Sequence, residues 1–128
     1  MTSSEMQPPP DVESFLPLTP AVFHVLLALA DGPSHGYAVM KEVETRTRGR
    51  VRLGPGTLYG ITKRLLADGW VAEVKAGSPA AAGRRGRRDF RLTALGRAVA
   101  AAEMRRLEDL LELARGKRWL PVSPRQKV

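Results

Sequence analysis

The basic side chains of this sequence are its best candidates for chemistry, because guanidinium and ammonium groups pair with polyanions. Four arginines lie close together after a stretch rich in Gly, Ala and Pro. Four such charges repel one another, which favours an extended loop until phosphates neutralise them. We therefore expect a contact with the backbone or minor groove of a nucleic acid from Arg84, Arg85, Arg87 and Arg88. A solvated basic loop without a partner is the alternative.

A second basic cluster lies on one side of a helix predicted to begin near residues 54–57. Leu58, Ile61 and Leu65 share a core-facing side at helical spacing, and the opposite side carries small residues and two cations. Small residues let a helix backbone approach DNA closely, hydroxyls donate to phosphates, and arginine pairs with guanine. The expected contacts are Gly56, Thr57, Tyr59, Gly60, Lys63 and Arg64. An ordinary solvated helix face is the alternative.

The start of the preceding helix supplies one further candidate. We expect His35 there, where the helix dipole favours an anion such as a phosphate, although a local cap is the alternative role. Tyr37 opens the same helix, and we expect its ring to be half-buried with the hydroxyl at the surface.

Other kinds of chemistry find little support in the composition. The chain has 128 residues, 21 Lys+Arg against 13 Asp+Glu, a formal net charge of +8 and no cysteine. The missing cysteines exclude disulfide scaffolds, thiolate metal sites and thiol catalysis, and the two histidines have no metal-ligand spacing. Glycines 54, 56 and 60 do not have the spacing of a dinucleotide-binding motif. We expect no enzyme, no cofactor and no metal.

The elements that would position the basic residues follow the order helix, helix, helix, strand, basic loop, strand, long helix. Thr19-Pro20 begins an apolar first helix, Ser34 is the expected cap of the second, and Thr93 that of the fourth. Residues 70–74 and 89–93 alternate as short strands. The predicted fold is mainly α, a winged helix-turn-helix with a three-helix core, a β-hairpin wing and a long C-terminal helix. The predicted divisions are a flexible N-terminal arm (1–17), the DNA-binding domain (18–93), a dimerisation helix (94–115) and a basic tail (116–128).

The long helix carries an apolar stripe with the 4-3-4-3 spacing of a short heptad seam. The seam comprises Ala100, Met104, Leu107, Leu111 and Ala114, and Leu110 and Leu113 widen the stripe. A small core offers little surface to cover it, so we expect a homodimer that sets two recognition helices roughly 34 Å apart, about one DNA turn. Packing back on the first helix of the same subunit is the alternative.

Four motifs occur in order along the chain: Gly32-Pro33-Ser34-His35-Gly36-Tyr37, Gly56-Thr57-Leu58-Tyr59, Asp68-Gly69-Trp70-Val71 and Phe90-Arg91-Leu92-Thr93-Ala94-Leu95-Gly96. Over about residues 18–100 the sequence resembles the PadR family of bacterial transcriptional regulators, in its short subfamily. The resemblance implies a winged-helix DNA-binding domain, a homodimer formed through the C-terminal helix and, usually, repression relieved by a small ligand. Gly60 departs from the family, in which proline often stands at this position.

The family resemblance also bears on Trp119. In this family, aromatic residues between the dimer helices sometimes hold planar ligands, so Trp119 is a candidate ligand contact. An anchor that fixes the tail is the alternative.

These observations predict a sequence-specific regulator of transcription that binds double-stranded DNA. We expect a homodimeric repressor of a palindromic operator, released by a small-molecule effector, at the nucleoid in a bacterial cytoplasm and without a membrane partner. RNA binding is one alternative, because residues 83–86 have the G-x-x-G form of a KH loop, although that loop joins two helices. A winged helix used only for protein contact is another.

Overall fold

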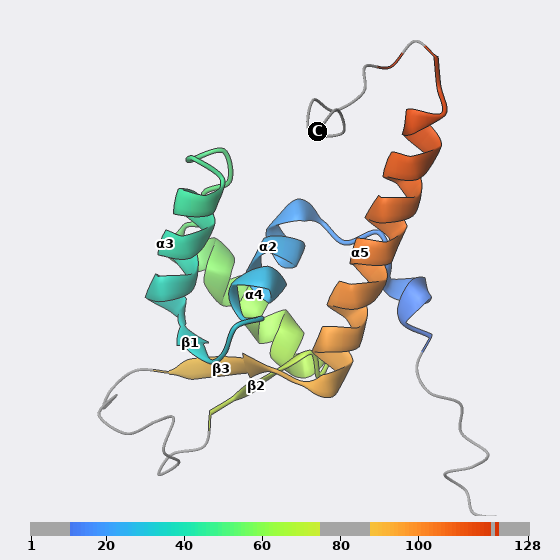
Figure 1. Cartoon of the computed structure of the whole chain (residues 1–128). Coiled ribbons are helices and arrows are strands. Elements are labelled where there is room, and N and C mark those ends of the chain that lie inside the picture. The colour runs from blue at the N-terminus through green and yellow to red at the C-terminus, as the bar shows by residue number, and fades with distance from the viewer. Residues whose placement is uncertain (1–10, 75–87, 119, 121–128) are drawn as a thin grey trace, which may run out of the picture.

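A computed structural model describes residues 11–74, 88–118 and 120 of the chain. Figure 1 shows the elements in the order η1 (Val12–Phe15), α2 (Pro20–Ala28), β1 (Ser34–His35), α3 (Gly36–Arg46), α4 (Pro55–Ala67), β2 (Val71–Glu73), β3 (Asp89–Leu92) and α5 (Ala94–Arg115). The strands lie together beneath α2, α3 and α4, and α5 rises beside them and extends past the core. The mainly α winged helix-turn-helix fold predicted from the sequence is confirmed.

The helix starts follow from short side chains that satisfy free backbone amides. The Thr19 hydroxyl accepts a hydrogen bond from Val22 N, and proline takes the first helical position of α2, as predicted. The predicted cap of α3 was wrong by one residue. His35, not Ser34, fills that position, because Ser34 is part of β1, and His35 Nδ1 accepts from Ala38 N at 3.4 Å.

The sheet holds one strand more than the sequence predicted. Its order is β1-β3-β2, with antiparallel pairing throughout. Ser34 lies opposite Phe90 on one side of β3, and Val71 lies opposite Leu92 on the other. Because β1 leads directly into α3, this pairing fixes the start of α3 against the strand that leaves the basic loop.

The core lies where α2, α3, α4 and α5 meet above the sheet. Leu26, Val43, Leu65 and Val99 have the largest side chains that are fully buried. Burial of each such side chain stabilises the fold by about 1.5–3 kcal/mol. One buried residue from each of the four helices therefore contributes to a single core.

The segment before α2 is ordered from residue 11, whereas the sequence suggested a flexible arm as far as residue 17. The Asp11 carboxylate accepts from Glu13 N at 3.1 Å and caps η1. The Phe15 ring meets the Trp70 ring edge-on, with centroids 5.3 Å apart. Since η1 also packs against α5, the segment is held by tertiary contacts that local sequence does not reveal.

The junction between β3 and α5 is tied closely to the end of α4. The Thr93 hydroxyl accepts from Gly96 N at 3.0 Å, as its predicted capping role requires, and donates to the Gly69 carbonyl at 2.6 Å. A Cβ on Gly96 would overlap the Trp70 carbonyl, so only glycine fits there. The start of α5 is thereby locked against the turn after α4.

Within the described residues, no helix is long and apolar enough to cross a membrane. The same part of the chain contains no cluster of His, Asp and Glu suited to a metal ion.

Candidate nucleic-acid interface

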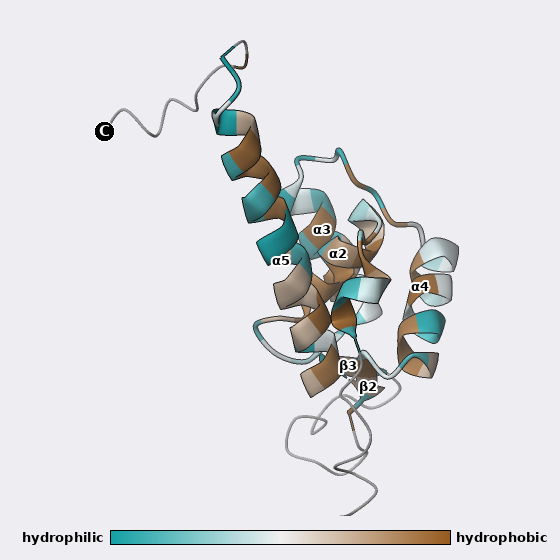
Figure 2. Ribbon diagram, turned by 90° about the vertical axis from the view of Figure 1, so that its right-hand side faces the viewer, coloured by the Kyte–Doolittle hydropathy of each residue, from teal (hydrophilic) through white to brown (hydrophobic). Residues whose placement is uncertain are grey.

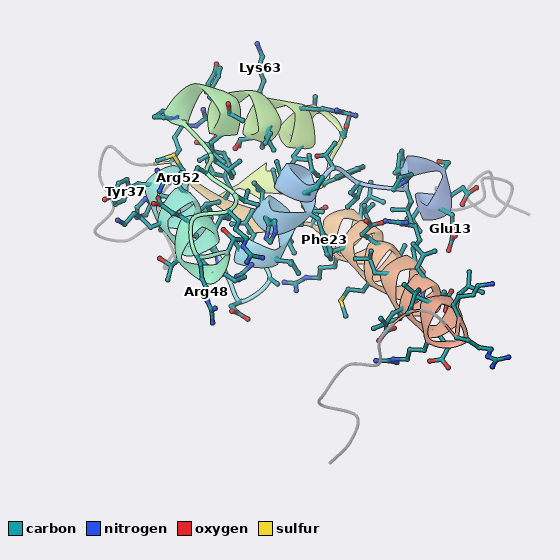
Figure 3. All side chains as sticks on the ribbon, turned by 90° about the horizontal axis from the view of Figure 1, so that it is seen from above. Glu13, Phe23, Tyr37, Arg48, Arg52 and Lys63 are labelled. Carbon is teal, nitrogen blue, oxygen red and sulfur yellow. The ribbon has the colours of Figure 1, made fainter. Side chains whose placement is uncertain are left out.

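The exposed side of α4 carries the residues that the sequence placed there. Leu58 and Leu65 are buried, which turns the opposite side of the helix outward as predicted. All six of its candidate residues are exposed: Gly56, Thr57, Tyr59, Gly60, Lys63 and Arg64. Figure 3 shows Lys63 projecting from α4 away from the other helices. We call these six residues the α4 face.

Two glycines of the α4 face have no role in packing. A Cβ built on Gly56 or Gly60 would meet nothing within 4 Å. Each glycine inside a helix costs about 1 kcal/mol relative to alanine. Neither glycine is therefore required by packing within the chain, and each leaves the backbone of α4 open on its outer side.

The two cations of the α4 face remain available to an external anion. Lys63 has no ion pair within the described residues. Arg64 Nε lies 3.7 Å from an Asp68 carboxylate oxygen, but the Arg64 side chain is 75% exposed. Such an exposed pair contributes little stability, so Arg64 can exchange this carboxylate for another anion at small cost.

Arg88 lies at the base of the predicted wing and is already engaged. Its Nε and Nη2 donate to the Glu73 carboxylate at 3.0 and 3.2 Å. These hydrogen bonds hold the pKa of Glu73 below its ordinary value. The Arg88 guanidinium also lies 5.2 Å from the centre of the Phe90 ring. Arg88 therefore clamps the end of β2 to the start of β3, and Arg84, Arg85 and Arg87 lie outside the described residues.

The start of α3 differs from expectation at Tyr37. His35 serves as the local cap described above, and its proposed phosphate contact stays a prediction. Tyr37 is 63% exposed rather than half-buried, because its ring lies along a groove instead of in the core. This groove, of about 780 Å³, runs between α3 and α4 and ends at β3. Tyr59, Lys63 and Arg88 also line it.

Sequence reasoning overlooked the arginines of the loop between α3 and α4. Arginine occupies every second position from 46 to 52, a pattern that could have been noticed. Arg46 pairs with Glu42, whereas Arg48, at φ +55°, and Arg50 are exposed. Figure 3 shows Arg48 projecting to the side opposite Lys63. Arg48 therefore adds positive charge on a side of the molecule that the α4 face does not share.

The predicted dimerisation stripe divides along α5. Ala100 packs against the core, and Ala114 is partly buried. Met104, Leu107, Leu110 and Leu111 are 40–51% exposed, and Leu113 is 61% exposed. Figure 2 shows these apolar turns on the part of α5 that extends beyond the core. Trp119 lies outside the described residues.

Comparisons with known proteins agree on one family. Residues 25–102 match the model of the "Transcriptional regulator PadR-like family". The chain is 36% identical over 87 residues to the transcriptional regulator Rv3488 of Mycobacterium tuberculosis. This match covers 68% of this chain and 75% of that protein. It is 58% identical over 43 residues to an uncharacterised 37.1 kDa protein of a Streptomyces fradiae transposon, but this match spans 34% of the chain and only 12% of that relative. The structure of a transcriptional regulator from Clostridium thermocellum has the same fold, with a TM-score of 0.60, 18% identity and coverage of 88% of this chain and 93% of the other.

Proposed function

Because the chain belongs to the PadR-like family of transcriptional regulators, which are not enzymes, we propose that it binds a palindromic operator in double-stranded DNA as a homodimer. In this proposal the α4 face enters the major groove, and the arginines of the wing contact the flanking phosphates or minor groove. Binding represses transcription, and a small-molecule effector relieves the repression. Such an operator places the protein at the nucleoid of a bacterial cytoplasm.

The observation that carries this proposal is the pair of glycines on the α4 face. They lower the stability of the helix, they make room for no other group of the chain, and they lie beside Lys63. A duplex that approaches the helix backbone closely would use the space that they leave. A solvated helix face would gain from alanine at both positions.

The proposed dimer is supported by the exposed stripe of α5. Met104, Leu107, Leu110 and Leu111 lie on one helix, and burying each such side chain is worth about 1.5–3 kcal/mol. A second copy related by a twofold axis offers each stripe an identical stripe as its partner. The effector contact at Trp119 rests on the family resemblance alone.

Selection of bound fragments from random duplexes tests the proposal. A palindromic consensus is the expected result. If a dimer makes about 8–10 phosphate contacts, the log–log slope of affinity against salt should be about −7 to −9. Neutralising Arg84, Arg85, Arg87 and Arg88 together should make that slope less steep. Equal binding to single strands or RNA, or no binding to duplexes at low salt, would contradict the proposal.

A matched pair of variants tests the role of the α4 face. Gly60→Leu fills the gap beside the helix backbone, and operator affinity should fall at least about five-fold through loss of base contacts worth about 1–3 kcal/mol. Thr45→Leu adds a similar apolar side chain to an exposed position near the end of α3 and should bind normally. Unchanged affinity of Gly60→Leu would remove α4 from the interface.

A further inference from the structure

The groove between α3 and α4 has a lining that the proposed contacts to phosphate do not explain. Its walls are mostly apolar and include Tyr37 and Met40 from α3, Tyr59 and Leu66 from α4, and Phe90 from β3. Tyr37 and Tyr59 stand on opposite walls and are 63% and 61% exposed. Apolar surface that is continuous along a groove, unlike single exposed residues, marks a binding site.

The groove opens on the side of α4 that carries the proposed DNA contacts. At 100° per residue, Tyr59 lies about 40° around the helix from Lys63 and about 60° from Gly56. A duplex that contacts Gly56 and Lys63 therefore also meets the Tyr59 wall. The Lys41 ammonium lies 5.9 Å from the centre of the Tyr37 ring and adds positive charge beside the opposite wall.

The charge of the groove fits DNA better than it fits a neutral or cationic occupant. His35, Lys63 and Arg88 line it, and the described lining includes no acidic residue. A phosphate can pair with the Lys63 ammonium at the edge of the groove, since Lys63 has no ion pair within the described residues. The side chains of Met40, Leu66 and Phe90 in its walls offer no hydrogen bonds, so polar base edges placed against them would lose their water without compensation.

One feature of the major groove is apolar, namely the C5 methyl group of thymine. We propose that the groove between α3 and α4 recognises a thymine methyl group in each operator half-site, with the Tyr59 ring as the principal contact and Tyr37 opposite it. This proposal rests on the proposed binding of double-stranded DNA and adds a source of sequence specificity. The tyrosine hydroxyls remain free to donate to the adjoining phosphates.

Deoxyuridine tests the proposal, because it removes the methyl group and leaves base pairing intact. Each thymine of the selected operator is replaced in turn by deoxyuridine, and the affinity of the full chain is measured by fluorescence anisotropy. Losing one buried methyl should weaken binding about four-fold, and symmetric replacement in both half-sites about sixteen-fold. Equal affinity for every deoxyuridine operator would overturn the proposal and leave DNA binding itself intact.

Protein variants test whether Tyr59 is the side chain that contacts the methyl group. Tyr59→Ala should bind the thymine and deoxyuridine operators equally, whereas Tyr59→Phe, which keeps the ring, should retain the preference for thymine. Lys63→Gln is the matched control on the same wall, and it should weaken binding to the thymine and the deoxyuridine operators by the same factor. Because Tyr59 is largely exposed, the unfolding midpoint of Tyr59→Ala should match that of the wild type.

Two outcomes would assign the groove to another occupant. If Tyr59→Ala preserves the preference for thymine, the methyl group lies elsewhere and the proposal fails. If Tyr59→Ala instead changes the sedimentation coefficient of the free protein, the groove is a contact between protein chains, which also overturns the proposal. Failure to bind any duplex would reject the proposed function itself.

Discussion

The first and second halves of α5 are parts of one continuous helix, but their apolar residues have different surroundings. From Ala94 to Glu103 the helix buries Gly96, Val99, Ala102 and Glu103 against the rest of the chain. From Met104 to Arg115 it buries none, and its leucines are 40–61% exposed. Hydrophobic spacing alone runs through both halves without a break. The difference shows that the pattern identifies a buried stripe, while only the tertiary structure tells which part is covered within the chain.

Adding one methyl group at the start of the covered half should give the largest effect. Gly96→Ala places a Cβ against the Trp70 carbonyl and should lower the free energy of unfolding by about 3 kcal/mol, as overpacking of a tight site does. The same change at an open position of α4, Gly60→Ala, should raise the free energy of unfolding by about 1 kcal/mol. Urea unfolding measures both. Equal effects would mean that the close approach at Gly96 is not a constraint.

Charges in the exposed half should break the proposed dimer and leave the fold intact. Leu107→Glu combined with Leu111→Glu should sediment as a folded monomer, with operator affinity reduced by about 100-fold or more because two linked sites no longer bind together. Ala98→Glu adds a charge to an exposed position in the first half and should remain dimeric. An intact dimer in the double variant would favour packing of the stripe elsewhere.

The ion pair made by Glu103 at the end of the covered half should carry measurable stability that depends on pH. Glu103 is 3% exposed and accepts from Arg106 at 2.8 and 2.9 Å, which lowers the pKa of Glu103 below its ordinary value. Glu103→Gln should cost about 2 kcal/mol at pH 7, the usual value for a hydrogen bond to a charged group.

The direction of the pH effect follows from the lowered pKa. The ionised Glu103 stabilises the fold fully above the carboxyl pKa of the unfolded chain, about 4.3, and this stabilisation disappears as the pH falls through the lower pKa of the folded chain. The difference between wild type and Glu103→Gln should therefore be constant from pH 8 to 6 and shrink in acid. A difference that grows in acid would contradict this assignment.

The corresponding pair of the exposed half should matter least. Glu112 lies three residues before Arg115, the same spacing as Glu103 and Arg106, but it is 79% exposed and its oxygen is 3.5 Å from Arg115 Nη1. Glu112→Gln should change the free energy of unfolding by about 0.3 kcal/mol. Thermal unfolding of this variant beside Glu103→Gln isolates the effect of burial at constant spacing.

Much of the fold was predictable where local chemistry decides the structure. Thr19-Pro20 and Thr93 are side-chain caps that act within three residues, so their sequence sufficed. The α4 face followed from the spacing of Leu58 and Leu65, because a helix with one buried side exposes the other.

The parts of the structure that the sequence did not predict depend on contacts between residues far apart in the chain. Strand β1 has two residues, too few for any alternation, and exists because it pairs with β3. Residues 12–15 became ordered through Phe15 against Trp70, a contact that crosses more than fifty positions. Tyr37 lies exposed beside a groove whose other wall comes from α4 and β3. No single stretch of sequence contains these partners.

The Thr93 hydroxyl has two roles, and these link the orientation of α5 to that of α4. The Thr93 hydroxyl caps α5 and donates to the carbonyl of Gly69, two residues beyond the end of α4, so it ties the start of the long helix to the end of α4. The 22 residues of α5 span about 33 Å, so a tilt of about 10° moves one end by about 6 Å relative to the other. If two chains pair through α5 as proposed, a small change in the angle between the two helices would therefore alter the separation of the two α4 faces.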